Sequence, residues 1–184
     1  IAPLSETFYI EPITFGYTYI ILTPELMRSN LGNWTYQGNT TGGNVSTMLQ
    51  GSRDSKEHSL TPATKEIVIP SNGFYRIFAY SRDYASGTFE PGTRFFNVQI
   101  GNSISQILGT HCQDGWAWQN SGFVPIFAGR QDLKLIDTSG YFARVGMIIV
   151  TDDPDFEAED TSAFFTAMKA MAYDDSKYAD FVTP

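Results

Sequence analysis

The chain has 184 residues, of which 42% are hydrophobic and 15% aromatic, and its formal net charge is −8. This length suits one well-buried domain and is short for two. The acidic balance argues against a nucleic-acid partner, which needs a basic patch, and the scattered Lys and Arg residues form no polybasic membrane segment. The single cysteine, Cys112, excludes an intrachain disulfide. No apolar run approaches the roughly 20 residues of a membrane-spanning helix.

The first segment, residues 4–23, predicts two short strands. Side chains alternate along a strand, so Ile21 faces one side and Ile20 the other, each with apolar neighbours. We therefore expect this part of the sheet to be covered on both faces. Glu11 lies inside the segment and has two interpretations: a carboxylate that faces water at a strand end, or a ligand for a cation.

Residues 24–62 are rich in Gly, Asn, Ser and Thr, have little periodicity, and are predicted to form a loop. Pro24 to Ser29 could form one helical turn. Two large rings, Trp34 and Tyr36, lie in this polar segment. They either anchor the loop in the core or form a platform for a ligand.

Residues 63–70 alternate as a strand, and a turn at residues 71–73 leads into a long strand at residues 73–82. One face of the long strand is apolar and must be core. Its other face, Arg76, Phe78, Tyr80 and Arg82, is aromatic and basic, which is unusual for a solvent face. A second polar loop follows, and residues 93–100 predict the next strand.

Residues 109–152 contain strand-like runs with a turn signal about every ten residues, including Gly122 and Gly129. Trp116 and Trp118 are two residues apart, so their side chains share one face of a strand. This rhythm predicts an all-β, antiparallel β-sandwich. The stretch contains no nucleophile motif, no metal-ligand spacing and no phosphate-binding loop.

The C-terminal residues predict a short helix after the sandwich. Residues 152–160 are acidic and are interpreted as a solvated linker. Residues 162–172 have helical periodicity, and Thr161 or Ser162 can cap them. We therefore expect a sandwich domain at 1–153, followed at 154–184 by a linker and a helix that leads to, or packs on, another domain.

Several segments together resemble a known pattern: FYIEP, ATKEIVIPSNGFYRIFAYSRD, RFFNVQIG, WAWQNSG, AGRQDLKLID and YFARVGMIIVTDD. The set resembles the galactose-binding-like jelly rolls of non-catalytic carbohydrate-binding modules, of the type of families six and thirty-five, over about residues 6–153. The resemblance implies two antiparallel sheets and a glycan site in the loops at one end. It also implies a tethered, polysaccharide-degrading catalytic domain and an extracellular, periplasmic or cell-surface location.

The resemblance also suggests a weak structural calcium site. Glu11 matches a family glutamate that is often a calcium ligand, and it is the best single candidate. Two further carboxylates of the family pattern are replaced by Ile13 and Gly146. Because calcium wants six to eight oxygen ligands, we expect any calcium to bind weakly.

The expected ligand is a polysaccharide or oligosaccharide, whose sugar rings have an apolar face and a rim of hydroxyls. Tyr or Trp rings cover such a face, and Asp, Asn and Arg pair with hydroxyls. Trp118 is assigned to the core, and Arg144 has the alternative role of a clamp on Asp137. The predicted ligand-binding residues are Trp34, Arg82, Asp83, Tyr84, His111, Trp116 and Arg144.

Two other functions compete with glycan binding. A sandwich-fold lyase or hydrolase would use acid–base candidates among His111, Asp114, Asp83 and Asp137, but it needs two convergent carboxylates. A structural spacer or protein-docking domain would bury all its aromatic residues. We expect a non-catalytic domain, in which Cys112 is not a nucleophile because no motif places a helper beside it.

Overall fold

The computed structural model describes residues 16–38, 40, 42–52, 61–83, 92–139 and 141–181. Glu11, Ile13 and Tyr84 lie outside these residues, as does the strand expected before Gly16. In chain order the strands are β1 (Tyr19–Leu22), β2 (Thr35–Gly38), β3 (Thr47–Gln50), β4 (Ala63–Ile69), β5 (Gly73–Asp83), β6 (Phe96–Ile100), β7 (Ser103–Ile104), β8 (Gly115–Ile126), β9 (Gly129–Asp137) and β10 (Arg144–Thr151). The helices are α1 (Pro24–Met27), α2 (Ser162–Ala170) and a 3-10 helix, η1 (Asp175–Phe181). None of the described helices is long and apolar enough to cross a membrane.

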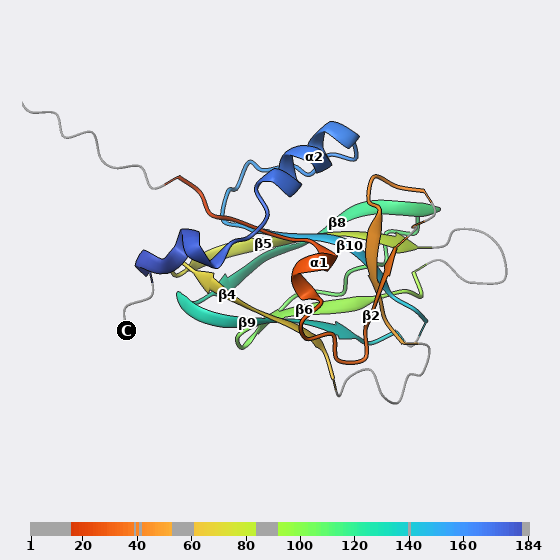
Figure 1. Ribbon diagram of the computed structural model, residues 1–184, viewed down its shortest axis with the longest axis horizontal. Helices are drawn as coiled ribbons and strands as arrows, with labels where there is room; N and C mark the ends of the chain where they lie inside the picture. The colour runs from red at the N-terminus through yellow and green to blue at the C-terminus, as the bar shows by residue number, and fades with distance from the viewer. Residues whose placement is uncertain are drawn as a thin grey trace, which may run out of the picture.

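Two antiparallel sheets form a sandwich (Figure 1). The first sheet has the order β2-β3-β10-β5-β8, with β1 also paired to β10, and the second has the order β4-β9-β6-β7. All pairs among the described strands are antiparallel. The predicted all-β jelly-roll class is therefore confirmed, and it follows from strands too closely spaced in sequence for helical crossovers.

The main core lies between the two sheets. In β5, Tyr75, Ile77 and Ala79 point into this core, as their alternation predicts. In β1, Ile20 also faces the main core, whereas Ile21 faces the outer side of the first sheet. The expectation that β1 is covered on both faces is confirmed.

A second apolar cluster covers the outer face of the first sheet and explains the unusual face of β5. Residues 153–170, here called the C-terminal strap, lie over it, with α2 above the sheet in Figure 1. Phe165 packs on Tyr80 at 4.6 Å between ring centroids and on Trp118 at 5.5 Å. Phe156 packs edge-on against Phe78. Phe78, Tyr80 and Trp118 on this face are thus covered by the chain itself.

Hydrogen bonds fasten the acidic part of the strap to the sheet, although none of the side chains of residues 152–160, interpreted from the sequence as a solvated linker, is buried. The Arg76 guanidinium donates to the carbonyls of Asp153 and Phe156, both at 2.8 Å. The Trp118 indole donates to the Glu159 carbonyl at 3.0 Å. The acidic side chains of this segment suggest exposure, but its carbonyls and Phe156 face the sheet.

Three local predictions differ from the structure. The polar stretch 24–62 contains β2 and β3, which are held by pairing with each other and with β10 rather than by apolar alternation. The turn expected at Gly122 is an irregularity inside β8, where the pairing register with β5 shifts and Gly122 has φ +70°. Beyond the helix expected at residues 162–172, the chain forms a further helix, η1, that the sequence did not predict.

Candidate functional site

One end of the sandwich gathers most of the described residues that the sequence nominates for ligand binding. There β5 ends opposite the start of β8, with Asp83 paired to Gly115, and β10 begins at Arg144, paired to Gln50. We call this end the loop rim; it comprises residues 51–52, 82–83, 92–94, 109–114 and 138–144 without 140, on the right in Figure 1. The opposite end holds the β4–β5 turn and η1.

Asp83 holds two loops of the rim together through hydrogen bonds. Its side chain is completely buried, and its Oδ2 accepts hydrogen bonds from the backbone N–H groups of Gly92, at 2.8 Å, and Cys112, at 3.0 Å. One carboxylate oxygen therefore joins two loops that are distant in sequence. A fully buried side chain cannot touch a ligand, so Asp83 positions the rim and is not a sugar contact.

His111 is engaged through both ring nitrogens. Its Nδ1 accepts from the Gln113 N–H at 3.1 Å, and its Nε2 lies 2.9 Å from the Ser81 carbonyl oxygen. A carbonyl only accepts, so this network places a proton on Nε2 and leaves Nδ1 as the acceptor. The ring fixes residues 111–113 against the end of β5 and has no nitrogen left to act as a base.

Trp34 and Trp116 are core residues and not ligand platforms. Trp34 is 2% exposed, its indole N–H donates to the Leu135 carbonyl at 3.0 Å, and its ring packs edge-on against Phe96. Trp116 is 8% exposed and stacks on Tyr80 at 5.2 Å. Both rings pack in apolar surroundings that the local sequence did not reveal, so their burial speaks against the predicted sugar contacts at these two positions.

Two arginines on the rim remain partly exposed. Arg82 stands opposite Trp116 in the register of β5 and β8. Arg144 donates through Nε to the Gln50 side-chain oxygen at 3.2 Å. Asp137, the clamp partner considered for Arg144, is buried, and its Oδ1 accepts from the backbone and hydroxyl of Ser139 instead.

Tyr141 is the rim residue that sequence reasoning missed. It lies in the β9–β10 loop, and its ring is 51% exposed. The buried Arg94 guanidinium donates to the carbonyl of the next residue, Phe142, at 2.9 Å, which fixes the loop. The available signal was the aromatic pair Tyr141 and Phe142 just after Gly140. The regular turn spacing predicts only a strand connection there.

The described residues include no metal-binding group of three, and the acid–base candidates taken from the sequence include no accessible pair of carboxylates. No group of three His, Cys, Asp or Glu side chains suited to a metal occurs among them, and Glu11 is outside them. At Gly146 a Cβ would lie 2.8 Å from Val45 and 3.1 Å from Trp116, so packing excludes the aspartate of the family pattern. Asp83 and Asp137 are both buried, which leaves Asp114 as the one exposed member of the considered set.

Comparison with known proteins identifies the architecture. No family model and no curated protein sequence matches the chain. Among solved structures, the C-terminal family 6 module of a marine laminarinase from Zobellia galactanivorans superposes with a TM-score of 0.51 at 16% identity, covering 73% of this chain and all of that one. The fold is that of a carbohydrate-binding module.

Two further structures agree with this assignment. The family 35 module of Cellvibrio japonicus Abf62 has a TM-score of 0.52 at 15% identity, covering 72% of this chain and 92% of that one. The family 6 module from Cellvibrio mixtus lichenase 5A, solved in complex with cellotriose, has a TM-score of 0.50 at 12% identity, covering 72% and 95%. At these identities the module fold is shared, and what each module binds is a property of that module.

Proposed function

We propose that this chain is a non-catalytic glycan-binding domain whose ligand docks on the loop rim. The observation that carries the proposal is the placement of an exposed ring, Tyr141, at the same end of a module-type sandwich as Arg82 and Arg144. A tyrosine ring covers the apolar face of a sugar, and guanidinium groups donate to hydroxyl or carboxylate oxygens. Tyr84 joins this group as a sequence-based prediction.

The chemistry of the rim favours neutral or acidic sugars. Its partly exposed polar groups include two guanidiniums, whereas Asp83 and Asp137 are buried and already accept hydrogen bonds. Guanidinium groups bind carboxylates through paired hydrogen bonds. We further propose that the domain serves a tethered polysaccharide-active enzyme outside the cytoplasm, as its module fold suggests.

The test is titration of the full chain with a panel of neutral and acidic polysaccharides. Tyr141→Ala and Tyr84→Ala should each weaken binding by about 1–3 kcal/mol, on the scale of ring stacking against nucleobases. Phe127→Ala, which removes an exposed ring from the opposite end, is the control and should leave affinity unchanged. Full affinity in both tyrosine variants would contradict the rim as the site.

A structural spacer or protein-docking domain is the second candidate, and the burial of Trp34 and Trp116 favours it. In that case the aromatic residues serve only packing. The same panel separates the two functions, because a spacer binds none of the glycans while keeping its full stability.

A further inference from the structure

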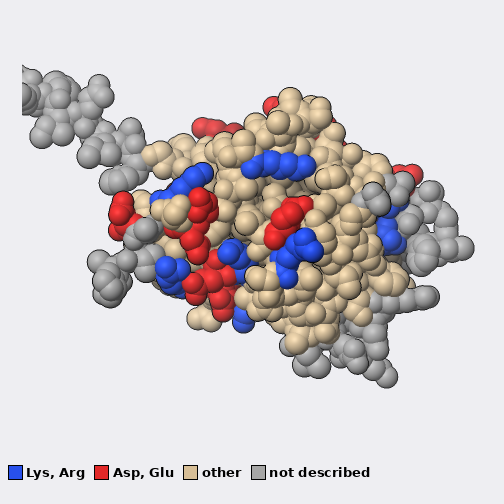
Figure 2. All heavy atoms as spheres, in the orientation of Figure 1, with Lys and Arg blue, Asp and Glu red and all other residues tan. Residues whose placement is uncertain are grey.

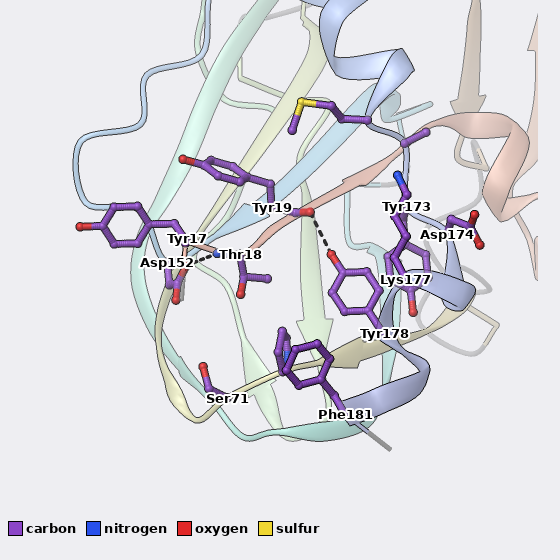
Figure 3. A pocket seen from close by; sticks show the side chains of 14 residues that line it. Tyr17, Thr18, Tyr19, Ser71, Asp152, Tyr173, Asp174, Lys177, Tyr178 and Phe181 are labelled. Atoms are coloured by element: carbon purple, nitrogen blue, oxygen red, sulfur yellow. Dashed lines mark hydrogen bonds between the residues drawn. The ribbon is translucent and has the colours of Figure 1, made fainter. Parts of the chain in front are cut away.

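A large hollow lies at the end opposite the loop rim. Its volume is about 800 Å³, within the roughly 300–1,000 Å³ that small-molecule sites occupy. Residues at the start of β1, in the β4–β5 turn, after β10 and in η1 form its walls (Figure 3). We call it the η1 pocket; none of its lining residues belongs to the loop rim.

One wall of the η1 pocket is a row of aromatic rings. Tyr173 and Tyr178 stack at 5.3 Å with an interplanar angle of 23°, and Phe181 follows Tyr178 at 6.4 Å. Tyr173 is buried, whereas Phe181 is 47% exposed, so the row runs from the core to the surface. Its exposed end at Phe181 offers ring surface to a flat apolar ligand surface, and the stacked tyrosines support that end from the core.

Hydrogen bonds hold this aromatic wall in place. The Tyr178 hydroxyl donates to the Tyr19 carbonyl at 3.2 Å, and the Tyr173 hydroxyl accepts from the Val68 N–H at 2.9 Å. The rings are thereby joined to β1 of one sheet and β4 of the other. A wall that is already ordered loses little conformational entropy when a ligand binds.

The facing wall carries polar groups beside two further rings. Figure 3 shows Thr18, Asp152 and Ser71 on the side opposite Tyr178 and Phe181, next to the rings of Tyr17 and Tyr19. The Thr18 N–H donates to Asp152 Oδ1 at 2.7 Å, which fixes the carboxylate. An aromatic wall opposite hydroxyl and carboxylate groups matches the two sides of a sugar ring, one of C–H groups and one of hydroxyls.

The charges of the η1 pocket select against anions. Two carboxylates, Asp152 and Asp174, and one ammonium, Lys177, line it. On the face shown in Figure 2, acidic and basic side chains both gather at this end of the molecule. The pocket lining itself has an excess of negative charge, opposite in sign to the arginine-bearing loop rim.

We propose that the η1 pocket is a second, independent glycan site that takes a short segment of neutral or amino-bearing sugar and excludes uronic acids. The ligand stacks on Phe181 and Tyr178 and turns its hydroxyls toward Thr18, Ser71 and Asp152. The ammonium of an amino sugar gains attraction from the carboxylates and from the ring faces. This site does not rest on the loop rim, because the two share no residue.

The test uses the full chain and three sets of short oligosaccharides: neutral hexose, glucosamine and glucuronic acid. We expect saturable binding of the neutral or glucosamine set, at least tenfold tighter than of the uronic set. Phe181→Ala should weaken this binding at least tenfold. Phe127→Ala, which removes another exposed phenylalanine at the same end but outside the pocket, should not change it.

Phe181→Ala could weaken binding by unfolding η1 and not by removing a ligand contact, so a second variant tests the pocket from its other wall. Ser71→Leu adds bulk to the polar wall and keeps the backbone carbonyl that accepts from the Tyr75 hydroxyl, so it should block the pocket without loss of thermal stability. Absence of binding, preference for uronic acids, or unchanged affinity in both pocket variants would overturn the proposal. Loss of binding in Tyr141→Ala but not in the pocket variants would assign the only glycan site to the loop rim.

Discussion

Asp83 has no contact with solvent, yet one of its oxygens determines how two rim loops meet. Asp83→Asn keeps the shape of the side chain but replaces a charged acceptor with a neutral amide. Hydrogen bonds to charged groups contribute about 1.5–3 kcal/mol, so we expect unfolding free energy to fall by about that amount. Urea denaturation measures the loss, and the rim affinity should fall with it.

A matched position tests whether the loss is specific to the rim. Asp132→Asn changes an exposed aspartate on β9, away from the rim, and it should shift stability by less than about 0.5 kcal/mol. Equal stability of the Asp83 and Asp132 variants would show that the buried carboxylate does not organise the loops.

Gly146 is the second residue at which a small change has a large expected effect. An added methyl group would lie 2.8 Å from Val45 and 3.1 Å from the Trp116 ring. Overpacking of this kind costs about 1–3 kcal/mol, so Gly146→Ala should lower the urea midpoint. Gly38→Ala, where a methyl group meets nothing within 4 Å, is the control and should have little effect. A Gly146 variant as stable as the control would contradict the close packing.

The sequence predicts residue types at the rim better than it predicts their exposure. Alternation indicated that Trp116 and Trp118 share a face, but not that Tyr80 and Phe165 cover that face. Burial depends on contacts made by a strap some forty residues later in the chain. The exposed ring of Tyr141 was missed for the same reason, since exposure is a property of the whole surface and not of the local sequence.

At the scale of elements, α2 behaves as part of the sandwich. Its Phe165 side chain points toward the sheet and is 1% exposed. The Thr161 hydroxyl caps the helix N-terminus by accepting a hydrogen bond from the Phe164 N–H at 3.2 Å. Periodicity and capping correctly predicted the helix, whereas the face it covers was not predicted. The covered face is formed jointly by β5, β8 and β10, which are distant in sequence, so no local pattern indicates it.

Phe165→Ala should therefore destabilise the sandwich itself. Removing a buried phenylalanine typically costs about 3–5 kcal/mol, and we expect one cooperative unfolding transition with a lower midpoint. Trp118 stacks on Phe165, so tryptophan fluorescence follows the change directly. Lys169→Ala, on the exposed side of the same helix, is the control. An unchanged midpoint in Phe165→Ala would mean that the helix is not part of the cooperative unit.

For the molecule as a whole, buried tyrosines limit stability at high pH. Burial, reinforced by a hydrogen bond to Asp153, raises the pKa of Tyr19 to about 12, and burial also raises the pKa of Tyr75 and Tyr178. A raised folded-state pKa gives stability that is complete below the unfolded value, about 10, and is lost as pH rises through the folded value.

We therefore expect the urea midpoint to be constant just below pH 10 and to fall between about pH 10 and about pH 12. Tyrosinate absorbance should rise together with unfolding. Tyr19→Phe removes one of these groups and should make the fall shallower in that range. A midpoint that does not change up to pH 12 would contradict the raised values.

The described chain ends lie close together, which affects how this domain can be joined to other domains. Gly16 and Phe181 both line the η1 pocket, so the described chain ends lie near each other. Domains with adjacent ends can be inserted into a surface loop of another protein or circularly permuted. Inserted in this way, the sandwich would present Tyr141 and its arginines outward, and the η1 pocket would lie at the seam with the host.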